Sequence, residues 1–336
     1  MEGIKMSKKP KLKNPCLIVA WPGMGEVAFR AASYLIEALP AEEFADIPAQ
    51  DFFYLTASFV KEGVLQLPEL PYGKFYYWKN PSLKRKGSST ADSSAKTEDN
   101  DLIIFLSNAQ PDLNKAEAYS KMILELAKGF KAQMIIGIAS MPQPIDHTQP
   151  AAVWCCATTA ELNNTLKRYN FNILSDSQIS GMNGLFLGLA KREGFRGFCI
   201  LGEIPLYTIQ IENPRASLAV LSALEKILGL KINFSGLSEQ AQNMENEINK
   251  FLDFLKIGPG SGPIGEEEIE KIKKTLSQLT RLPVSVKEKI EKLFEQARTD
   301  IAKAGELKVE LDKWSVYKEY EDRFLDLFRK TKEKGN

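Results

Sequence analysis

The stretch QISGMNGLFLGLAKREGFRGFCILGEIP (residues 178–205) predicts a helix over 182–192 followed by a buried strand over 197–203. Glycines at such a junction serve one of two purposes. They expose backbone N–H groups that bind a phosphate, or they let the helix lie close to a sheet. The stretch holds no nucleophile with an adjacent base, so we interpret its glycines as packing residues.

Each glycine near the start of this helix has a structural interpretation. Gly184 and Gly188 are four residues apart, so they share one helix face and are predicted to let its backbone approach the sheet. Gly181 can supply a positive φ before the helix, where Ser180 or Asn183 is placed to cap it.

Strands and helices alternate on both sides of this stretch. The run at 16–20 is continuously apolar and those at 101–107 and 132–139 are largely so, as in central strands, and the aromatic-rich runs at 52–57 and 74–79 also indicate strands. Helical patterns cover 26–39, 113–128, 158–169 (a helix or mixed segment) and 214–228. The alternation predicts an α/β fold, arranged as a three-layer α/β/α sandwich.

Composition sets the limits of the predicted domains. Residues 1–14 are basic and lack the apolar core of a signal peptide, so we expect a disordered tail. The α/β/α domain covers 15–256 and carries a polar, flexible loop at 84–100. The segment GPGSGPIG indicates a linker at 257–265, followed by an all-helical domain at 266–336.

The C-terminal domain is predicted to hold helices over 266–279, 286–304 and 307–332. The last places an apolar stripe on one face, which we interpret as the core of an intramolecular bundle and, as the alternative, a docking face for a partner. Its members are Leu307, Leu311, Trp314, Tyr317, Tyr320, Phe324 and Phe328.

Charge and cysteine usage exclude several classes of function. The 336 residues include 44 Lys plus Arg and 43 Asp plus Glu, a net charge of +1, so no nucleic-acid partner is expected. No apolar run reaches the length of a membrane span, so no membrane association is expected. Four cysteines without a CxxC pair favour a reduced, cytoplasmic protein with thiols in its core.

His147 is the only histidine of the chain. Metal sites built from several histidines, and Ser-His-Asp sites built on any other histidine, are therefore excluded. His147 stands beside Asp146 and ahead of Cys155 and Cys156, so a Cys-His nucleophile pair is conceivable. We favour core thiols and a His147 bonded to nearby backbone in a turn, and we expect no metal and no cofactor.

The segment GMGEVA (residues 23–28) matches the dinucleotide pattern G-x-G-x-x-A between a strand and a helix. Glu26 would place a negative charge beside the pyrophosphate, and PAEEFADIP follows the helix in place of a strand ending in an acidic residue. We interpret the segment as a structural turn. The alternative is a small-ligand crevice lined by Gly23, Gly25, Glu26, His147, Ser180, Gly181, Asn183, Gly184 and Glu203.

Four segments together resemble the proteasome assembly chaperone 2 family of archaea and bacteria, across residues 15–254. They are LIVAWPGMGEVAFRAASYLIEAL, IDHTQPAAV, ISGMNGLFLGLAKREGFRGFCILGEIPLY and NPRASLAVLSALEKILGLKINFSGLSEQAQNMENEI. The resemblance implies a phosphorylase/hydrolase-like α/β/α fold and, as in several prokaryotic members, a homotrimer. It implies no established enzyme activity, and eukaryotic relatives help to assemble proteasome α-rings.

The chain departs from the family's pattern at three places. Gln149 stands where Arg is usual, Ile145 and Asp146 replace the Pro before His147, and Glu26 follows the glycine turn where Asn or a similar residue is common. If relatives form an anion pocket in this region, these changes put it in doubt here.

We therefore predict a non-enzymatic, cytoplasmic protein that self-associates and binds other proteins in an assembly-chaperone-like role. The alternative hypothesis is a ligand-binding protein or enzyme that acts on a nucleoside-like or phosphorylated compound in the crevice at the sheet edge. Ligands separate the two hypotheses, because a compound that binds the native state raises its melting temperature.

Overall fold

The computed structural model describes residues 3–54, 58–61, 63–81, 100–256, 284–313 and 316–332. The chain forms two compact units, one of residues 1–205 with 211–249 and one of residues 206–210 with 250–336. Within the described ranges, no helix is both long and apolar enough to cross a membrane.

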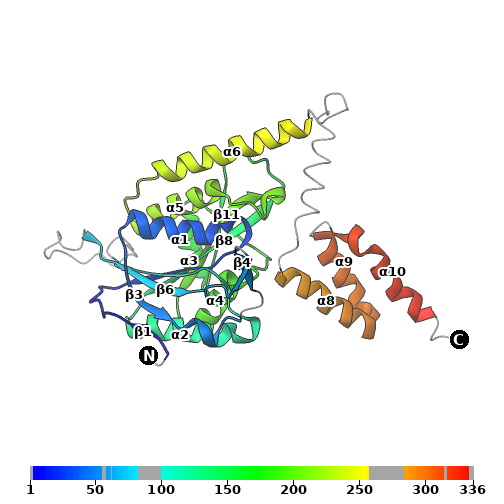
Figure 1. Cartoon of the computed structure of the whole chain (residues 1–336), viewed down its shortest axis with the longest axis horizontal. Coiled ribbons are helices and arrows are strands. Elements are labelled where there is room, and N and C mark those ends of the chain that lie inside the picture. The colour runs from blue at the N-terminus through cyan, green and yellow to red at the C-terminus, as the bar shows by residue number, and fades with distance from the viewer. Residues whose placement is uncertain are drawn as a thin grey trace. The chain divides into compact units, whose positions relative to one another are not determined.

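Four parallel strands form the centre of a nine-stranded mixed sheet in the first unit (Figure 1). In spatial order they are β7 (Leu102–Ser107), β2 (Cys16–Ala20), β8 (Met134–Gln143) and β11 (Gly197–Pro205). β2 lies between β7 and β8, which both come later in the chain and pair with it in parallel. In open α/β sheets, the loops at the carboxyl ends of the strands surround such a switch point.

Shorter strands extend the sheet at both edges. On the β7 side, β6 (Gly73–Trp78), β3 (Glu42–Ile47) and β1 (Lys5–Met6) follow in antiparallel order. On the β11 side, β9 (Val153–Ala157) pairs antiparallel with β11, and β10 (Asn172–Ile173) lies parallel to β9.

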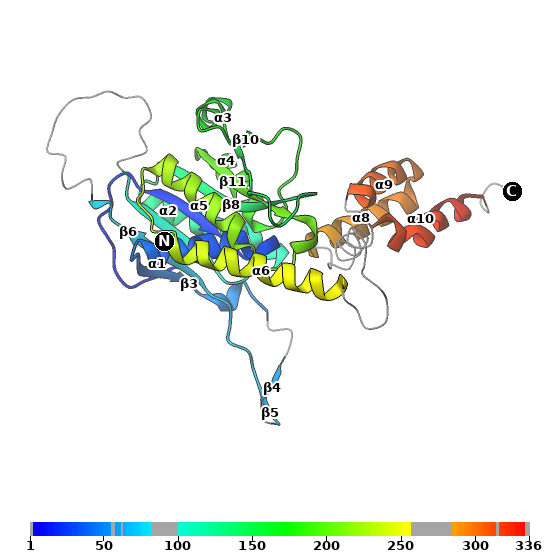
Figure 2. The same cartoon turned by 90° about the horizontal axis from the view of Figure 1, so that it is seen from above.

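Helices cover both faces of the sheet, which confirms the predicted three-layer α/β/α arrangement (Figures 1 and 2). One face carries α1 (Val27–Ala38) and α5 (Pro214–Leu228), and the other carries α2 (Ala116–Gly129) and α4 (Met182–Arg192). The long α6 (Ser235–Lys256) runs along the layer of α1 and α5. The short α3 (Ala160–Lys167) packs on β9, with Thr159 as its cap.

Burial accounts for the continuous apolar runs of the central strands. Every residue of β2 and β7 is buried, because helices lie on both faces. At the end of β2, the Trp21 indole packs against Phe105 and Phe186, each with ring centroids 5.4 Å apart. The predicted limits of α5 are confirmed, with Asn213 as the cap and Gly229 in the left-handed region at φ 62°.

The prediction of a disordered N-terminal tail is wrong for residues 3–14. Lys5 and Met6 form β1 against β3, and the Lys13 N–H donates to the Asp101 carboxylate at 2.6 Å. The basic composition indicates mostly exposed side chains, and these are found. It says nothing about the backbone groups, which pair at the edge of the sheet.

The strand predicted at 52–57 is wrong for its described part, residues 52–54. Phe52 and Phe53 follow a single 3-10 turn (Ala49–Asp51), and both rings pack on Tyr119. The strand instead precedes them as β3, within the segment PAEEFADIP that showed no strand pattern. Because β3 is antiparallel and lies near the sheet edge, it does not supply the parallel strand of a dinucleotide-binding unit.

The second unit contains three described helices, α8 (Val284–Thr299), α9 (Ala304–Lys313) and α10 (Tyr317–Lys332). The long helices predicted over 286–304 and 307–332 are therefore interrupted after Thr299 and before Tyr317. Apolar side chains from all three helices pack into one core, formed by Ile290, Phe294, Leu307, Leu311, Phe324 and their neighbours. Trp314, the linker at 257–265, the helix predicted at 266–279 and residues 84–99 of the polar loop lie outside the described residues.

Candidate functional site

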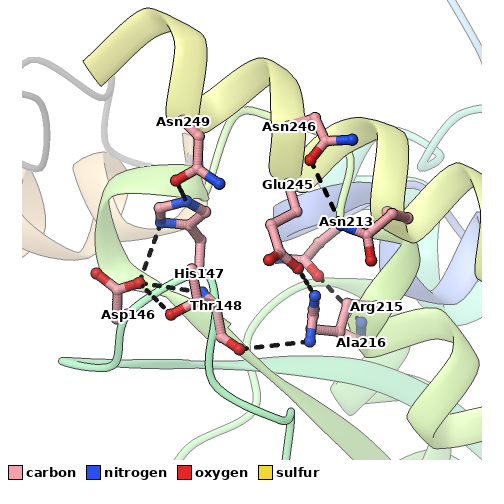
Figure 3. A network of polar contacts seen from close by, with 10 residues as sticks. Asp146, His147, Thr148, Asn213, Arg215, Ala216, Glu245, Asn246 and Asn249 are labelled. Atoms are coloured by element: carbon pink, nitrogen blue, oxygen red, sulfur yellow. Dashed lines mark hydrogen bonds and ion pairs between the residues drawn. The ribbon is translucent and has the colours of Figure 1, made fainter. Parts of the chain in front are cut away.

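Asp146 organises the loop that follows β8. Its Oδ1 atom accepts hydrogen bonds from the Thr148 backbone N–H at 3.0 Å and from the Thr148 hydroxyl at 2.8 Å, as in an Asx turn. The Gln149 N–H donates to the Asp146 carbonyl at 3.1 Å. This turn presents the His147 side chain to α6 (Figure 3).

His147 connects the loop to α6. Its Nε2 atom lies 2.9 Å from Asn249 Oδ1, and its Nδ1 atom lies 3.3 Å from Asp146 Oδ1 (Figure 3). The side chain is buried, with the residue only 7% exposed. The sequence predicts a turn histidine bonded to nearby backbone, and the structure adds a side-chain partner 102 residues away. In this arrangement the imidazole holds a distant helix against the loop.

An ion pair lies beside this histidine. Arg215, in the first turn of α5, pairs with Glu245 on α6, and its Nη1 atom lies 3.5 Å from the Thr148 carbonyl oxygen (Figure 3). Both charged side chains are largely shielded from solvent, so salt screens the pair less than it screens an exposed pair. The loop, α5 and α6 are thus joined by three neighbouring polar contacts.

The glycine turn after β2 packs against the start of α5. Gly25 has φ 64°, and a Cβ atom there would lie 3.2–3.3 Å from side-chain atoms of Ile204 and Asn213. The Gly25 carbonyl accepts a hydrogen bond from the Asn213 N–H at 2.8 Å. Asn213 in turn caps α5 by accepting from the Ala216 N–H at 3.0 Å. The positive φ and the close approach both favour glycine at this position.

Glu26 completes the turn and precedes α1. Its own φ of 51° lies in the left-handed region, which is uncommon for a residue with a side chain. Burial raises the pKa of the Glu26 carboxyl, while a hydrogen bond from the Gly23 backbone and the positive charge of Arg30 act in the opposite direction. Arg30 itself pairs with Glu212, just before α5.

Gln110 occupies the position in front of α4 where an anion would bind. Its Oε1 atom accepts from the Met182 N–H at 3.0 Å, and its Nε2 atom donates to the Pro22 carbonyl at 2.8 Å. Gly181 has φ 73°, and the Gln110 amide atoms would lie only 3.0–3.1 Å from a Cβ atom added there. A side chain from the loop after β7 therefore satisfies the first N–H of the helix.

Asn183 ties α4 to the end of β2. Its Oδ1 atom accepts from the Trp21 N–H at 3.0 Å, and its Nδ2 atom donates to the Trp21 carbonyl at 3.1 Å. The predicted capping role of Asn183 is thus replaced by a two-point contact with another segment. The same amide would lie 3.3 Å from a Cβ atom at Gly23, so the structure brings Gly23 and Asn183 together.

Gly184 and Gly188 differ, although the sequence predicts one role for both. A Cβ atom on Gly184 would overlap the backbone carbonyl of Ile179, so the close approach is to the segment before the helix. Gly188 is exposed and has no neighbouring atom within 4 Å of an added Cβ, so its predicted contact with the sheet is wrong. Helix α4 instead approaches the sheet at Asn183, whose carbonyl oxygen would lie 3.3 Å from a Cβ atom on Gly137 of β8.

Glu203 and Ser180 lie at the same edge of the sheet. Glu203 Oε1 accepts from the Trp154 indole N–H at 2.6 Å, and its Oε2 atom accepts from the Ala152 N–H at 3.3 Å. These contacts fasten β9 to the end of β11. Ser180 is half-buried directly before Gly181. Glu203 is adjacent to Ile204, the residue that packs on Gly25.

The cysteine thiols occupy environments that disfavour the thiolate. Burial raises the pKa of Cys16 to about 11 and that of Cys155 to about 12, and it raises the pKa of Cys156 and Cys199 as well. A catalytic thiol requires the reverse shift. Across the described residues, no three His, Cys, Asp or Glu side chains are grouped so that they could hold a metal ion.

Sequence reasoning did not identify the residues that complete these contacts. Gln110, Arg215, Glu245 and Asn249 are ordinary polar residues, and each meets its partner across a large separation in the chain. The segment NPRAS indicates the Asn213 cap and places Arg215 two residues after it. The sequence holds no signal for the partner of Arg215.

Fold and site together define a three-layer α/β/α protein whose loops, at the carboxyl ends of the central strands, bind the protein's own helices. The sequence pattern of the PAC2 family matches residues 17–252, and the chain belongs to this family. It is also 26% identical to the uncharacterized protein MJ1210 of Methanocaldococcus jannaschii, over 78% of this chain and 93% of that protein.

Solved structures of similar proteins agree with this assignment. Pyrococcus furiosus PbaB, an archaeal proteasome activator, is 28% identical, with a TM-score of 0.60 over 74% of this chain and 97% of PbaB. Pyrococcus furiosus PbaA, an archaeal homolog of proteasome-assembly chaperone, is 23% identical, with a TM-score of 0.54 over 74% of this chain and 96% of PbaA. Mycobacterium tuberculosis Rv2714, of unknown function, has a TM-score of 0.63 at 18% identity, over 82% of this chain and 90% of that chain. The last two likenesses concern the fold alone.

Proposed function

We propose that this protein is non-enzymatic and acts by binding other proteins, in an assembly-chaperone-like or regulatory role toward a proteasome. The observation that carries the proposal is the 28% identity to PbaB, an archaeal proteasome activator, over nearly the whole of PbaB. The match of the PAC2 family across residues 17–252 supports it.

The chemistry of the site also supports a binding function. The single histidine contacts Asp146 and Asn249, and burial raises the pKa of all four thiols. Gln110 already contacts the N–H group at the start of α4. His147 and Gln110 thus join segments of the protein, and the thiols are held in the unreactive, protonated form.

The proposal also includes self-association and a location in the cytoplasm. Four free cysteines, three of them buried, suit a reducing compartment. The homotrimer implied by the family resemblance is our expectation for the oligomer, and its mass is measured directly by sedimentation equilibrium.

The proposal is tested by binding to archaeal proteasome α-subunit rings and to complete 20S core particles. We expect immobilised rings to bind the full-length protein with a dissociation constant of about 1 µM or below, which corresponds to roughly −8 kcal/mol. We also expect binding to change either the rate of ring assembly or the peptidase rate of the core particle. Failure to bind either particle at about 100 µM would contradict the proposal.

A small ligand at the switch point is the second candidate function. The observation in its favour is the Trp21 indole N–H, which is buried and has no hydrogen-bond partner within the described part of the chain. Buried donors are normally paired, so a water molecule or an atom of a small ligand would complete this one. A panel of nucleosides, nucleotides and sugar phosphates that raises the melting temperature by several degrees would favour this function over the first.

A further inference from the structure

Two of the cysteines stand opposite each other on neighbouring strands. Cys156 of β9 is the register partner of Cys199 of β11, and the two strands run antiparallel. Side chains of directly opposite residues lie on the same face of a sheet. Both side chains accordingly pack in the core cluster that contains Phe186 of α4, where Cys199 is buried and Cys156 is half-buried. The two thiols are therefore neighbours on one face of the sheet.

The backbone brings these two residues to the separation that a disulfide requires. The Thr158 N–H donates to the Gly197 carbonyl at 2.8 Å, two residues along each strand, so Cys156 and Cys199 also form a hydrogen-bonded pair. The Cα atoms of such a pair lie about 5.5 Å apart, within the range of about 4.4–6.8 Å that disulfides span. The strands already hold the two residues in place for a covalent link.

The surroundings of the two thiols agree with this placement. Burial raises the pKa of Cys199, and the neighbouring Cys156 and Cys155 thiols raise it further. Burial also raises the pKa of Cys156, and a hydrogen bond from the Cys199 backbone opposes that shift. The Cys156 sulfur therefore lies against Cys199.

The register does not favour a link to either of the other two cysteines. Cys155 stands opposite Ile200 and, as the strand neighbour of Cys156, points to the opposite face. Cys16 lies on β2, which β8 separates from β11. The fold thus singles out Cys156 and Cys199 among the four thiols.

We propose that Cys156 and Cys199 form a reversible disulfide, which joins β9 to β11 under oxidising conditions. The oxidant is a small disulfide such as oxidised glutathione. The Cys156 thiolate attacks one sulfur of the oxidant, which forms a mixed disulfide and releases one glutathione. The Cys199 sulfur then attacks the Cys156 sulfur and releases the second glutathione. The two cysteines lose two electrons, and their two protons end on the two glutathione thiols.

The geometry of the pair makes this link easy to reduce. The Cβ atoms of directly opposite residues lie about 4.5–5.5 Å apart, whereas a disulfide draws them to about 3.8 Å. The closure strains the two strands, and strained disulfides are reduced more readily than structural ones. The thiols therefore stay reduced in a reducing compartment, and the link reports oxidation.

The link has a structural consequence at one edge of the sheet. β10 pairs with β9, and α3 packs on β9, so the disulfide fastens both elements to the central strand β11. The inference does not depend on which partner the protein binds.

Mapping of the cysteines in glutathione buffers tests the inference. The full-length protein is held to equilibrium at about pH 8, because only the thiolate reacts and burial keeps its fraction small. Free thiols are then blocked with N-ethylmaleimide, and the protein is digested in acid and analysed by mass spectrometry. In oxidised glutathione we expect most chains to yield a peptide pair joined through Cys156 and Cys199. Return to reduced glutathione should remove it.

Two substitutions separate this link from other thiol reactions. Cys156→Ser should abolish the linked peptide pair and leave Cys199 as a free thiol. The matched control is Cys155→Ala, which keeps both members of the pair and should leave the link unchanged. Equal melting temperatures of the reduced proteins show that the fold is retained, and the wild-type map decides alone if a variant fails to fold.

Three results in oxidised glutathione overturn the inference. The first is a protein that keeps all four thiols free, and the second is glutathione retained on Cys156 beside a free Cys199. The third is a disulfide that includes Cys16 or Cys155 or that joins two chains. A Cys156–Cys199 link that persists in reduced glutathione contradicts the proposed reversibility.

Discussion

The atoms next to each glycine of α4 determine its structural role. Gly184 makes room for the Ile179 carbonyl, whereas Gly188 faces open space one helical turn later. Both occupy the same stripe of the helix, so periodicity assigns them one role. The difference comes from the path of the chain before the helix, where Gly181 turns the backbone with φ 73°.

Alanine at these two positions is therefore expected to have opposite effects. Gly184→Ala should destabilise the protein by about 1–3 kcal/mol, because the new methyl group overlaps backbone that cannot move cheaply. Gly188→Ala should stabilise it by about 0.5–1 kcal/mol, because alanine restricts the unfolded chain and favours helix. Urea unfolding of the two variants measures both values. Equal effects at the two sites would show that the assigned contacts are wrong.

The buried thiols predict a particular pH dependence. Burial raises the pKa of Cys16 to about 11 and of Cys155 to about 12, so these groups remain protonated in the folded protein while the unfolded chain ionises near pH 8.5. Their contribution to stability is complete below the unfolded pKa and is lost as pH rises through the folded pKa, from about pH 9 to 12.

Thiol reactivity tests the burial of these cysteines in the folded protein. We expect Ellman's reagent at pH 8 to react slowly with Cys16, Cys155 and Cys199 in the folded protein, and rapidly with all four thiols in guanidinium chloride. The half-buried Cys156 serves as the internal comparison. Fast reaction of all four thiols in the folded state would contradict the assigned burial.

At the scale of the element, α6 is held in two ways. Leu237 and Ala241 bury apolar side chains near its start, Glu245 and Asn249 make polar contacts further along, and Leu252 is buried beyond them. Since the helix between Ala241 and Leu252 depends on directional contacts, removing one partner should loosen it without unfolding the sheet.

Asn249→Ala tests this division of α6. It leaves the buried His147 imidazole without its helix partner, at a cost of about 1–3 kcal/mol. Hydrogen exchange around Asn249 in α6 should accelerate about tenfold, while β2 and β8 stay protected. The control is Asn246→Ala, because Asn246 is exposed and bonds only weakly to Gln242 at 3.4 Å. Unchanged exchange in Asn249→Ala would mean that the contact does not hold the helix.

Elements whose signals are local were predictable from the sequence. The caps of α5 and the length of α4 follow from residues within a few positions of their ends. β3 escaped prediction because its exposed Glu42 and Glu43 interrupt the apolar pattern at the sheet edge. Phe52 and Phe53 indicated a strand through β propensity, and packing on Tyr119 overrode it.

The site was predictable as a set of positions but not as a set of contacts. Of the predicted residues, Gly23, Gly25 and Glu26 follow β2, His147 follows β8 and Glu203 lies near the end of β11, so the parallel topology brings these to one edge of the sheet. The residues at 180–184 instead lie at the start of α4. Which groups meet there depends on Gln110, Arg215 and Asn249. They contact Met182, Thr148 and His147, which lie 72, 67 and 102 residues away. Whether a ligand occupies this edge stays a prediction.

At the scale of the whole molecule, the chain combines two separate cores. The PAC2 family match ends at residue 252, and α8, α9 and α10 form a core of their own. We therefore expect two transitions in scanning calorimetry. Phe294→Ala, which empties a fully buried position of the second core, should lower one transition by a cost of about 3–5 kcal/mol and leave the other in place. A single transition that shifts as a whole would contradict independent cores.

The central claim is that this PAC2-family protein works through contact with a proteasome. Sedimentation velocity of the full-length protein mixed with archaeal 20S core particles tests it most directly. We expect a fraction of the protein to move with the particle, and this fraction to increase with concentration to saturation. Protein and particle that sediment separately at every concentration would contradict it.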